Sequence, residues 1–250
     1  MKLTVLNSGS SGNGYVLQNE TEALILECGC PVKNCIEALD YNTGKVVGCL
    51  ITHEHGDHAK HVSKYATYFN CYGSTGTVKA LCDKNSDKVS HFRLIPLSPL
   101  AKYQFGNFTI MPFPTEHDCD EPFGYLIKHP EIGVMVFATD TYFLRYTFAG
   151  LTNIMLECNY DLPILQENVR NGIIPKVVEE RTLRSHMSLE HCKDVLKAND
   201  LSNVSQIILI HLSGNNSEPE RFRQEIELLT GKKVLVAKKG LEVPLNTTPF

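Results

Sequence analysis

The sequence predicts an α/β protein in which two β-sheets pack together and helices cover them from the outside. Short β-rich runs dominate the first half of the 250-residue chain, and helical and β patterns alternate in the second half. No repeat, low-complexity tract or linker interrupts the chain, so we expect residues 1–250 to form one domain. A chain of this length can bury a substantial core.

The individual elements follow from local pattern and composition. Short runs rich in apolar and β-branched residues predict strands at Lys2–Leu6, Tyr15–Gln18, Ala23–Glu27, Val46–Thr52, Phe108–Pro112, Gly124–Lys128, Val134–Thr139, Asn153–Glu157, Gln206–His211 and Lys233–Ala237. Helical patterns predict helices at Cys35–Leu39, Ala59–Ala66, Leu162–Asn171, Leu189–Asn199 and Pro219–Leu229. Ser188 and Ser217 precede the last two helices and are expected to cap them.

Charge and cysteine content exclude several classes of protein. The net charge of −4 argues against a nucleic-acid-binding module with a basic surface, although metals and a local basic patch could still attract a phosphodiester. The odd number of cysteines, nine, disfavours a disulfide framework. The N-terminal residues lack a signal-peptide pattern, and no run approaches the ~20 apolar residues of a membrane span. We therefore expect a cytoplasmic protein with reduced thiols and no membrane association.

The segment THEHGDHAKH, residues 52–61, holds four of the ten histidines of the chain. On an extended segment, residues two apart point the same way, so His53 and His55 can hold one cation. A turn at Gly56 would direct Asp57 and His58 toward a second cation. Imidazole and carboxylate are ligands for Zn²⁺, and Mn²⁺ or Fe would also suit them.

Polar, ligand-capable residues also follow three other predicted strands. FTIMPFPTE leads to His117, GVMVFAT leads to Asp140, and SQIILI leads to His211. Strand ends hold ligands rigidly, and the loops that follow leave room for a substrate. His117 would give the first cation a third imidazole, Asp140 could contact both cations, and His211 would complete the second site.

These residues resemble the metallo-β-lactamase fold superfamily over nearly the whole chain. H-x-H-x-D-H is the signature of that superfamily, and His117, Asp140 and His211 match its later ligand motifs in order. The resemblance implies a four-layer αββα sandwich with a dinuclear metal site at one edge of the two sheets. It implies that one ion is bound by His53, His55 and His117, that the other is bound by Asp57, His58 and His211, and that Asp140 bridges them.

Three further stretches are similar to the YycJ/WalJ/VicX-like branch, which is associated with nuclease activity on DNA. They are NSGSSGN at 7–13, ECNYD at 157–161 and HLSGNN at 211–216. The chain departs from the superfamily pattern at two places. Glu27-Cys28-Gly29 replaces the usual Asp-x-Gly, and Ser185-His186 replaces the usual Gly-His.

The resemblance implies a dinuclear-metal-dependent hydrolase, foremost a phosphodiesterase or exonuclease-like nuclease. A metal-bridged hydroxide would be the nucleophile, and Asp57, Asp140 and His186 would be the catalytic residues. A protonated His186 could donate to an oxyanion or act as general acid, as a corresponding histidine does in phosphodiesterase relatives. The alternatives are a thioesterase or other small-molecule hydrolase on the same fold, and a regulatory protein that retains the metal site without catalysis.

Four residues are candidates for binding the substrate, which we expect to be a phosphodiester and preferably DNA. Ser10, Ser11 and Asn13 lie in a Gly/Ser loop whose backbone N–H groups could form an anion-binding nest, although such residues are equally typical of a turn. Arg184 belongs to the basic segment Arg181–Arg184 that leads into His186. It is a candidate for contact with the phosphate backbone.

Overall fold

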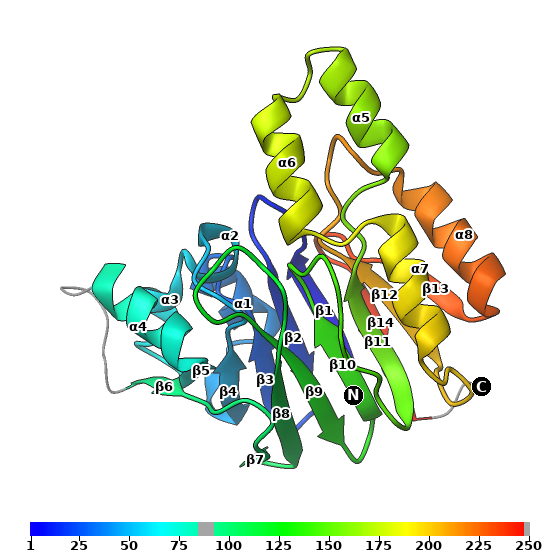
Figure 1. The fold of residues 1–250 in the computed structure, drawn as a ribbon. Coiled ribbons are helices and arrows are strands. Elements are labelled where there is room, and N and C mark those ends of the chain that lie inside the picture. Colours follow the sequence, from blue (N-terminus) through cyan, green and yellow to red (C-terminus); the bar gives the residue numbers. More distant parts are fainter. Residues whose placement is uncertain (85–92, 248–250) are drawn as a thin grey trace.

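Residues 1–84 and 93–247 are described by the computed structural model of the chain, and they form two seven-stranded sheets packed face to face (Figure 1). The first sheet has the order β14 (Glu242–Pro244), β1 (Lys2–Asn7), β2 (Gly14–Gln18), β3 (Ala23–Leu26), β4 (Val46–Leu50), β5 (Cys71–Gly73) and β6 (Leu94–Pro96). Its strands from β3 to β6 are parallel, and the remaining pairs are antiparallel.

The second sheet has the order β13 (Lys233–Val236), β12 (Gln206–Ile210), β11 (Leu151–Glu157), β10 (Gly133–Ala138), β9 (Phe123–His129), β8 (Phe108–Pro114) and β7 (Tyr103–Phe105). Strands β10 to β13 are parallel, and β7 to β10 pair in antiparallel fashion. Both sheets are therefore mixed, with a parallel half that needs helical crossovers.

Alternation along the strands places apolar side chains on both faces of each sheet. In β3, Leu24 and Leu26 point into the core between the sheets, where they join Phe137 of β10. Ile25, between them in sequence, faces the opposite way and packs with Cys35 and other residues of the outer helical layer. Because side chains of a strand alternate between faces, a strand buried on both sides is apolar throughout.

Helices cover the outer face of each sheet, which confirms the predicted αββα sandwich. The first sheet is covered by α1 (Val32–Ala38), α3 (Val62–Tyr65) and α4 (Thr75–Lys84). The second sheet is covered by α7 (Leu189–Ala198) and α8 (Pro219–Thr230). Short α2 (Gly56–Ala59), the 3₁₀ turn η1 (Thr43–Lys45), α5 (Leu162–Arg170) and α6 (Lys176–Ser185) complete the helical elements. In the part of the chain that is described, none of the helices has the length and apolar character of a membrane span.

Each predicted strand is present, but the three-residue strands β5, β6, β7 and β14 lie outside the predicted runs, and several helices also differ from the predictions. The expected helix Ala59–Ala66 is two short helices, α2 and α3, because His61 leaves helical geometry and its N–H donates to the carbonyl of Cys28 at 3.0 Å. Ser188 caps α7 as expected, accepting from the N–H of His191. Ser217 does not cap α8, since its hydroxyl donates to the carbonyl of Ser213 and the cap position is Glu218. Helices α4 and α6 were not predicted.

Backbone hydrogen bonds hold three loops together where β1, β3 and β4 end. The N–H of Asn13 donates to the carbonyl of Asp57 at 2.7 Å, and the N–H of Gly29 donates to the carbonyl of Asn13 at 2.9 Å. The N–H of Cys28 donates to the carbonyl of His58 at 2.7 Å. The loop 53–58 therefore depends on close approach of the segment 27–29.

We expect Gly29→Ala to destabilise the fold and to displace Asp57. A Cβ at Gly29 would lie 1.7 Å from the carbonyl oxygen of Asp57 and 2.6 Å from the backbone nitrogen of Asn13. Relief of such a clash requires a backbone shift, which costs about 1–3 kcal/mol and often more. Thermal unfolding of the variant should show a clear loss of stability. The matched control is Gly56→Ala in the same loop, where a Cβ meets nothing within 4 Å. Equal stability of the two variants would contradict this account.

Candidate metal centre

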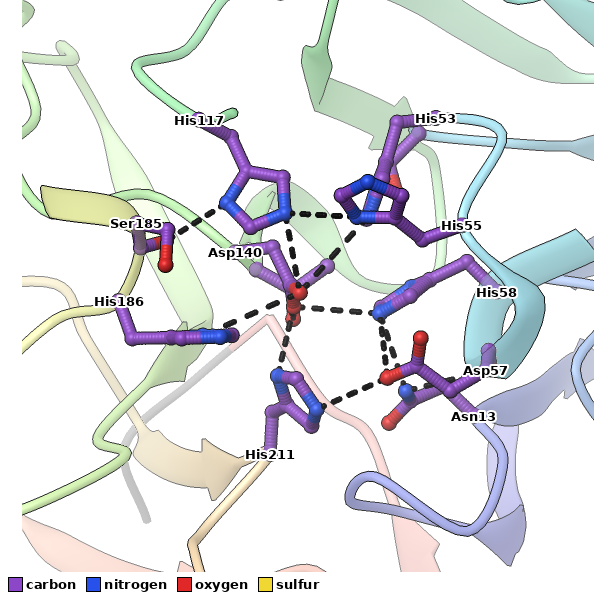
Figure 2. Close-up of polar contacts among 12 residues, drawn as sticks. Asn13, His53, His55, Asp57, His58, His117, Asp140, Ser185, His186 and His211 are labelled. Carbon is purple, nitrogen blue, oxygen red and sulfur yellow. Dashed lines mark hydrogen bonds and ion pairs between the residues drawn. The ribbon is translucent and has the colours of Figure 1, made fainter. Parts of the chain in front are cut away.

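Four strand ends deliver the predicted side chains to one edge of the sandwich. His53 follows β4 in the first sheet, whereas His117, Asp140 and His211 follow β8, β10 and β12 in the second. Strands β8 and β10 are both antiparallel to β9, and β12 is parallel to β11 beside β10, so these carboxyl ends lie together. Figure 2 shows the resulting cluster, in which all seven predicted ligands converge: His53, His55, Asp57, His58, His117, Asp140 and His211.

Three imidazoles form the first group of this cluster. His53 Nε2 lies 3.1 Å from His55 Nδ1, which in turn lies 3.0 Å from His117 Nε2. Nitrogens that share one tetrahedral zinc ion at 2.0–2.1 Å are about 3.3 Å apart, so this spacing suits a single cation. The grouping is the one that the resemblance implies for the first ion.

Asp57, His58 and His211 form the second group, and Asp140 lies between the two. Asp57 Oδ2 is 3.3 Å from the Nε2 atoms of both His58 and His211. Asp140 turns Oδ1 toward His58 Nε2 at 3.2 Å and toward His211 Nδ1 at 2.6 Å. Its other oxygen, Oδ2, lies 3.8 Å from His53 Nε2 and 3.6 Å from His117 Nε2. One carboxylate thus presents a separate oxygen to each group, as a bridging ligand would.

The backbone is held in the left-handed region at three residues of this edge. Asp140 has φ 47°, His211 has φ 55°, and Glu27 has φ 69°. Non-glycine residues rarely adopt this conformation, and it persists where surrounding structure imposes it. Here the positive φ directs each side chain from its strand end into the cluster.

A second layer of contacts orients the imidazoles. Thr52 Oγ1 lies 2.9 Å from His53 Nδ1, and His117 Nδ1 donates to the carbonyl of Ser185 at 2.7 Å. Each contact leaves the Nε2 atom free to face the centre of the cluster, which is the usual arrangement behind metal-binding histidines.

Glu27, the departure from the usual aspartate, still places a carboxylate behind His58. Its Oε1 atom lies 3.5 Å from His58 Nδ1, and both residues are fully buried. Neither of these two atoms has a hydrogen-bond partner among the residues that the structure describes. A buried carboxylate beside an imidazole N–H is satisfied best when that imidazole is bound to a cation or protonated.

The buried carboxylates of the cluster require positive charge beside them. Burial disfavours the imidazolium form of His58 and His211, but the neighbouring carboxylates, Asp140 foremost, together outweigh burial and raise the pKa of both well above its usual value. Burial also opposes ionisation of Asp140, yet His211 and His58 hold the pKa of its carboxyl well below its usual value. Burial and the charge of His58 keep the pKa of His53 well below its ordinary range. Once His58 and His211 give up their protons, the cluster offers imidazoles and carboxylates, a donor set that divalent cations fit.

Glu157, which the sequence analysis did not select, lies at the centre of a further contact network. It is fully buried at the end of β11, and its Oε1 lies 2.7 Å from His186 Nδ1 and 3.2 Å from His211 Nδ1. Its Oε2 accepts from the N–H groups of Thr141 and Met187. The carboxylate of Glu157 outweighs the effect of burial and raises the pKa of His186. The sequence held a signal for this residue, since Glu157 ends a predicted strand close to where the candidate ligands stand and begins the ECNYD motif.

Of the four residues predicted to bind substrate, only Ser10 lines the cleft beside the cluster. A cleft of about 570 Å³ lies over the cluster, and it is lined by Ser10, His55, Gly56, Asp57, His117, Asp140, Asn159, Ile174, Pro175, Val178, Arg181, Thr182, His186, His211, Leu212, Ser213, Asn215 and Asn216. Ser10 is thus at the cleft. Ser11 is not, and its hydroxyl accepts from Asn7 Nδ2. Asn13 is buried behind the cleft, with Nδ2 3.1 Å from His58 Nε2 and Oδ1 accepting from Gly9 N–H.

Arg184 is likewise not brought to the cleft. It is exposed on α6, whereas Arg181, three residues earlier on the same helix, lines the cleft. Which arginine of the segment reaches the cleft depends on helix α6, which the sequence analysis did not predict. Residues three apart on a helix share a side only approximately, so the helix position decides which arginine reaches the site.

Comparisons with known proteins agree with this architecture. No family model matches the chain. The chain is 25% identical to exodeoxyribonuclease YycJ of Bacillus anthracis, over 97% of its own length and 94% of that protein. It is 27% identical to exodeoxyribonuclease WalJ of Streptococcus pneumoniae, over 88% of its length and 84% of that protein.

Solved structures share the fold at lower sequence identity. The metallo-β-lactamase fold protein YhfI of Bacillus subtilis superposes with a TM-score of 0.71 at 16% identity, covering 97% of this chain and 98% of that one. Zn²⁺-bound PqqB of Methylobacterium extorquens superposes with a TM-score of 0.74 at 12% identity, covering 98% and 100%. Likeness at these identities establishes the architecture and leaves the chemistry to the residues of the site.

We expect Zn²⁺ binding to release protons and to strengthen as pH rises toward the raised pKa values of His58 and His211. Below their raised pKa values His58 and His211 hold protons, which must leave before these atoms can bind a cation. Calorimetric titration of metal-free protein in buffers of different ionisation enthalpy would count the protons. The His211→Ala variant should release fewer protons and bind fewer ions. Heats that are independent of buffer and affinities that are independent of pH would contradict this prediction.

Proposed function

We propose that this chain, which has the metallo-β-lactamase fold, is a metal-dependent phosphodiesterase that cleaves nucleic acid, with DNA as the favoured substrate. We expect it to act in the cytoplasm as one domain over residues 1–250. The observation that carries the proposal is the pairing of His186 with buried Glu157 beside the seven converging ligands. The names of the two exodeoxyribonuclease relatives support a nucleic-acid substrate.

The seven ligands are suited to hold two divalent ions, with Zn²⁺ or Mn²⁺ preferred and Fe also compatible. Bound ions would supply Lewis acidity and an activated water molecule for attack on phosphorus. Asp57 and Asp140 are the carboxylates of the set, and both line the cleft, so they would orient the ions toward the substrate. Negative charge from these two residues also helps to retain cations at the floor of the cleft.

His186 is positioned to hold and deliver a proton. Its Nδ1 is engaged by Glu157 at 2.7 Å, and because the residue lines the cleft, the opposite ring nitrogen is available to a substrate. The raised pKa of His186 keeps the imidazolium form available near neutral pH. The centroid of the His186 ring lies 5.4 Å from that of His117 and 5.3 Å from that of His211. The proton donor therefore lies beside both groups of candidate ligands. It can protonate a leaving oxygen or donate to a phosphoryl oxygen.

This donor favours phosphodiester cleavage over the thioesterase alternative. An alkoxide leaving group is strongly basic and needs a proton, whereas a thiol has a pKa of about 8.5 and leaves readily as a thiolate. A regulatory protein without catalysis would also have no need of a proton donor such as the His186–Glu157 pair beside the candidate ligands.

Hydrolysis assays of the purified protein test the proposal directly. We expect Mn²⁺- or Zn²⁺-loaded protein to cleave bis-p-nitrophenyl phosphate and a labelled DNA oligonucleotide, and to leave S-lactoylglutathione intact. Chelation of the metal should abolish both activities. Cleavage of the thioester alone would assign the site to a thioesterase, and silence on all three substrates would favour the regulatory alternative.

We expect His186→Ala to retain metal and to lose about 10²–10⁴-fold in turnover, as removal of a general acid does. Metal content by elemental analysis and kcat on the labelled DNA oligonucleotide, whose alkoxide leaving group needs a proton, check the two parts separately. The control is His191→Ala, five residues on, which is exposed and whose Nδ1 contacts the carbonyl of Tyr142. Turnover at the wild-type rate in His186→Ala would remove the proton-donor role.

We expect Glu157→Gln to move the alkaline limb of the pH–rate profile to lower pH. The Glu157 carboxylate raises the pKa of His186, so its neutral replacement lets His186 lose its proton earlier as pH rises. Because Glu157 also contacts His211, metal content must be measured on the same preparation. An unchanged alkaline limb at full metal occupancy would show that His186 does not set it.

A further inference from the structure

The α5–α6 hairpin forms one wall of the cleft. Figure 1 shows the two helices standing above the edge of the sandwich where β10, β11 and β12 end. Residues 174–182, from the end of the connecting loop and the first turns of α6, contribute Ile174, Pro175, Val178, Arg181 and Thr182 to the cleft lining. The hairpin therefore faces any substrate that reaches the metal centre.

Two polar contacts and a small apolar core fix the hairpin over the cleft. Arg221 of α8 pairs with Asp161 at the start of α5 at 2.8 Å. Asn168 Nδ2 donates to the carbonyl of Asn215 at 2.8 Å, which links α5 to the loop after β12. Tyr160, Leu165 and Ile174 form a small core of their own beneath the two helices. These contacts fix the position of the α5–α6 hairpin relative to the cleft.

Arg181 is held beside the metal centre with part of its guanidinium free. Its Nε donates to Asp118 Oδ2 at 2.7 Å, and Asp118 Oδ1 lies 3.3 Å from His117 Nε2. No partner of the two Nη atoms is found within residues 1–84 and 93–247. A guanidinium anchored through one nitrogen is pre-organised to offer its remaining N–H groups to a phosphate.

Apolar side chains surround this arginine at the tip of the hairpin. Ile173, Val177 and Val178 are 59%, 70% and 43% exposed, which leaves a cluster of aliphatic surface open to solvent. Only Val178 of these lines the cleft, together with Ile174, so these two residues offer the aliphatic surface to a substrate there, whereas Ile173 and Val177 lie outside it. An aliphatic surface beside a phosphate-binding arginine matches a nucleotide, since apolar side chains contact or wedge between base faces.

We propose that the α5–α6 hairpin recognises an unpaired nucleic-acid end, with Arg181 binding a phosphate next to the scissile one and Ile174 and Val178 contacting a base. This inference rests on the proposed function and adds its substrate. The cleft of about 570 Å³ is in the range of sites that enclose one small ligand, which corresponds to one or two nucleotides, and it is too small to enclose a paired duplex.

Five variants test the hairpin: two matched pairs, and Arg181→Lys as a conservative replacement. Arg181→Ala and Val178→Ser alter the cleft wall, whereas Arg184→Ala and Val177→Ser change neighbours of the same type on α6 that lie outside the cleft. Each is assayed on a single-stranded oligonucleotide, a blunt duplex of the same sequence and bis-p-nitrophenyl phosphate. Metal content and thermal unfolding are recorded for every variant.

We expect Arg181→Ala to raise KM for the single-stranded oligonucleotide about tenfold or more, well beyond any change on bis-p-nitrophenyl phosphate. Loss of one phosphate contact should also reduce the slope of log KM against log salt by about 1. Arg181→Lys should restore the salt dependence of KM more fully than KM itself. Lysine keeps the positive charge but lacks the planar guanidinium that donates several hydrogen bonds at once. Val178→Ser should raise KM without changing the salt slope, and the two control variants should match the wild type.

The outcomes separate failure of this inference from failure of the proposed function. Wild-type protein that cleaves no phosphodiester would end both proposals. Cleavage of the oligonucleotide with Arg181→Ala and Val178→Ser equal to their controls would overturn the hairpin alone. A blunt duplex cleaved as fast as the single strand would exclude recognition of an unpaired end. Cleavage of phosphatidylglycerol vesicles but of no oligonucleotide would assign the apolar tip to a lipid and overturn the inference.

Discussion

The carboxylate of Asp140 is the contact on which the two halves of the site depend. It lies at the end of β10, in the middle of the second sheet, and is almost fully buried. One of its oxygens faces His58 and His211, and the other faces His53 and His117. An ionised carboxylate at this depth is tolerable only with positive charge on both sides, so the surrounding structure must supply it or bind it.

The rest of the edge is arranged around that requirement. Left-handed backbone at three strand ends directs acidic and imidazole groups inward, and strain of this kind persists only where packing imposes it. The packed sheets below supply the rigid base, because their shared core fixes how β4 meets β10. Glu27 and Glu157 then stand behind the inner imidazoles as buried carboxylates. The metal centre is therefore a property of the whole sandwich, and its loop of four histidines is one part of it.

The proposed chemistry and the proposed recognition divide between two regions of the chain. The strand ends carry the candidate ligands and the His186–Glu157 pair, whereas the cleft wall comes from a helical hairpin with its own small core. Asp118 joins the two regions, since it contacts both His117 and Arg181. Under the proposed function, a change of hairpin would alter the substrate while the candidate metal centre stays constant, which is how one fold serves many reactions.

Periodicity alone predicted the longer strands, and the resemblance carried by H-x-H-x-D-H and the later motifs implied the αββα architecture and the seven residues that converge at one edge. The fold was needed to show that Glu157 contacts His186, that Asn13 lies behind the cleft, and that Arg181 lines the cleft whereas Arg184 does not. Those assignments depend on contacts between residues that are 29 to 63 positions apart in the sequence. They also depend on which side of helix α6 faces the cleft, and this helix was not predicted. Local pattern carries no information about either.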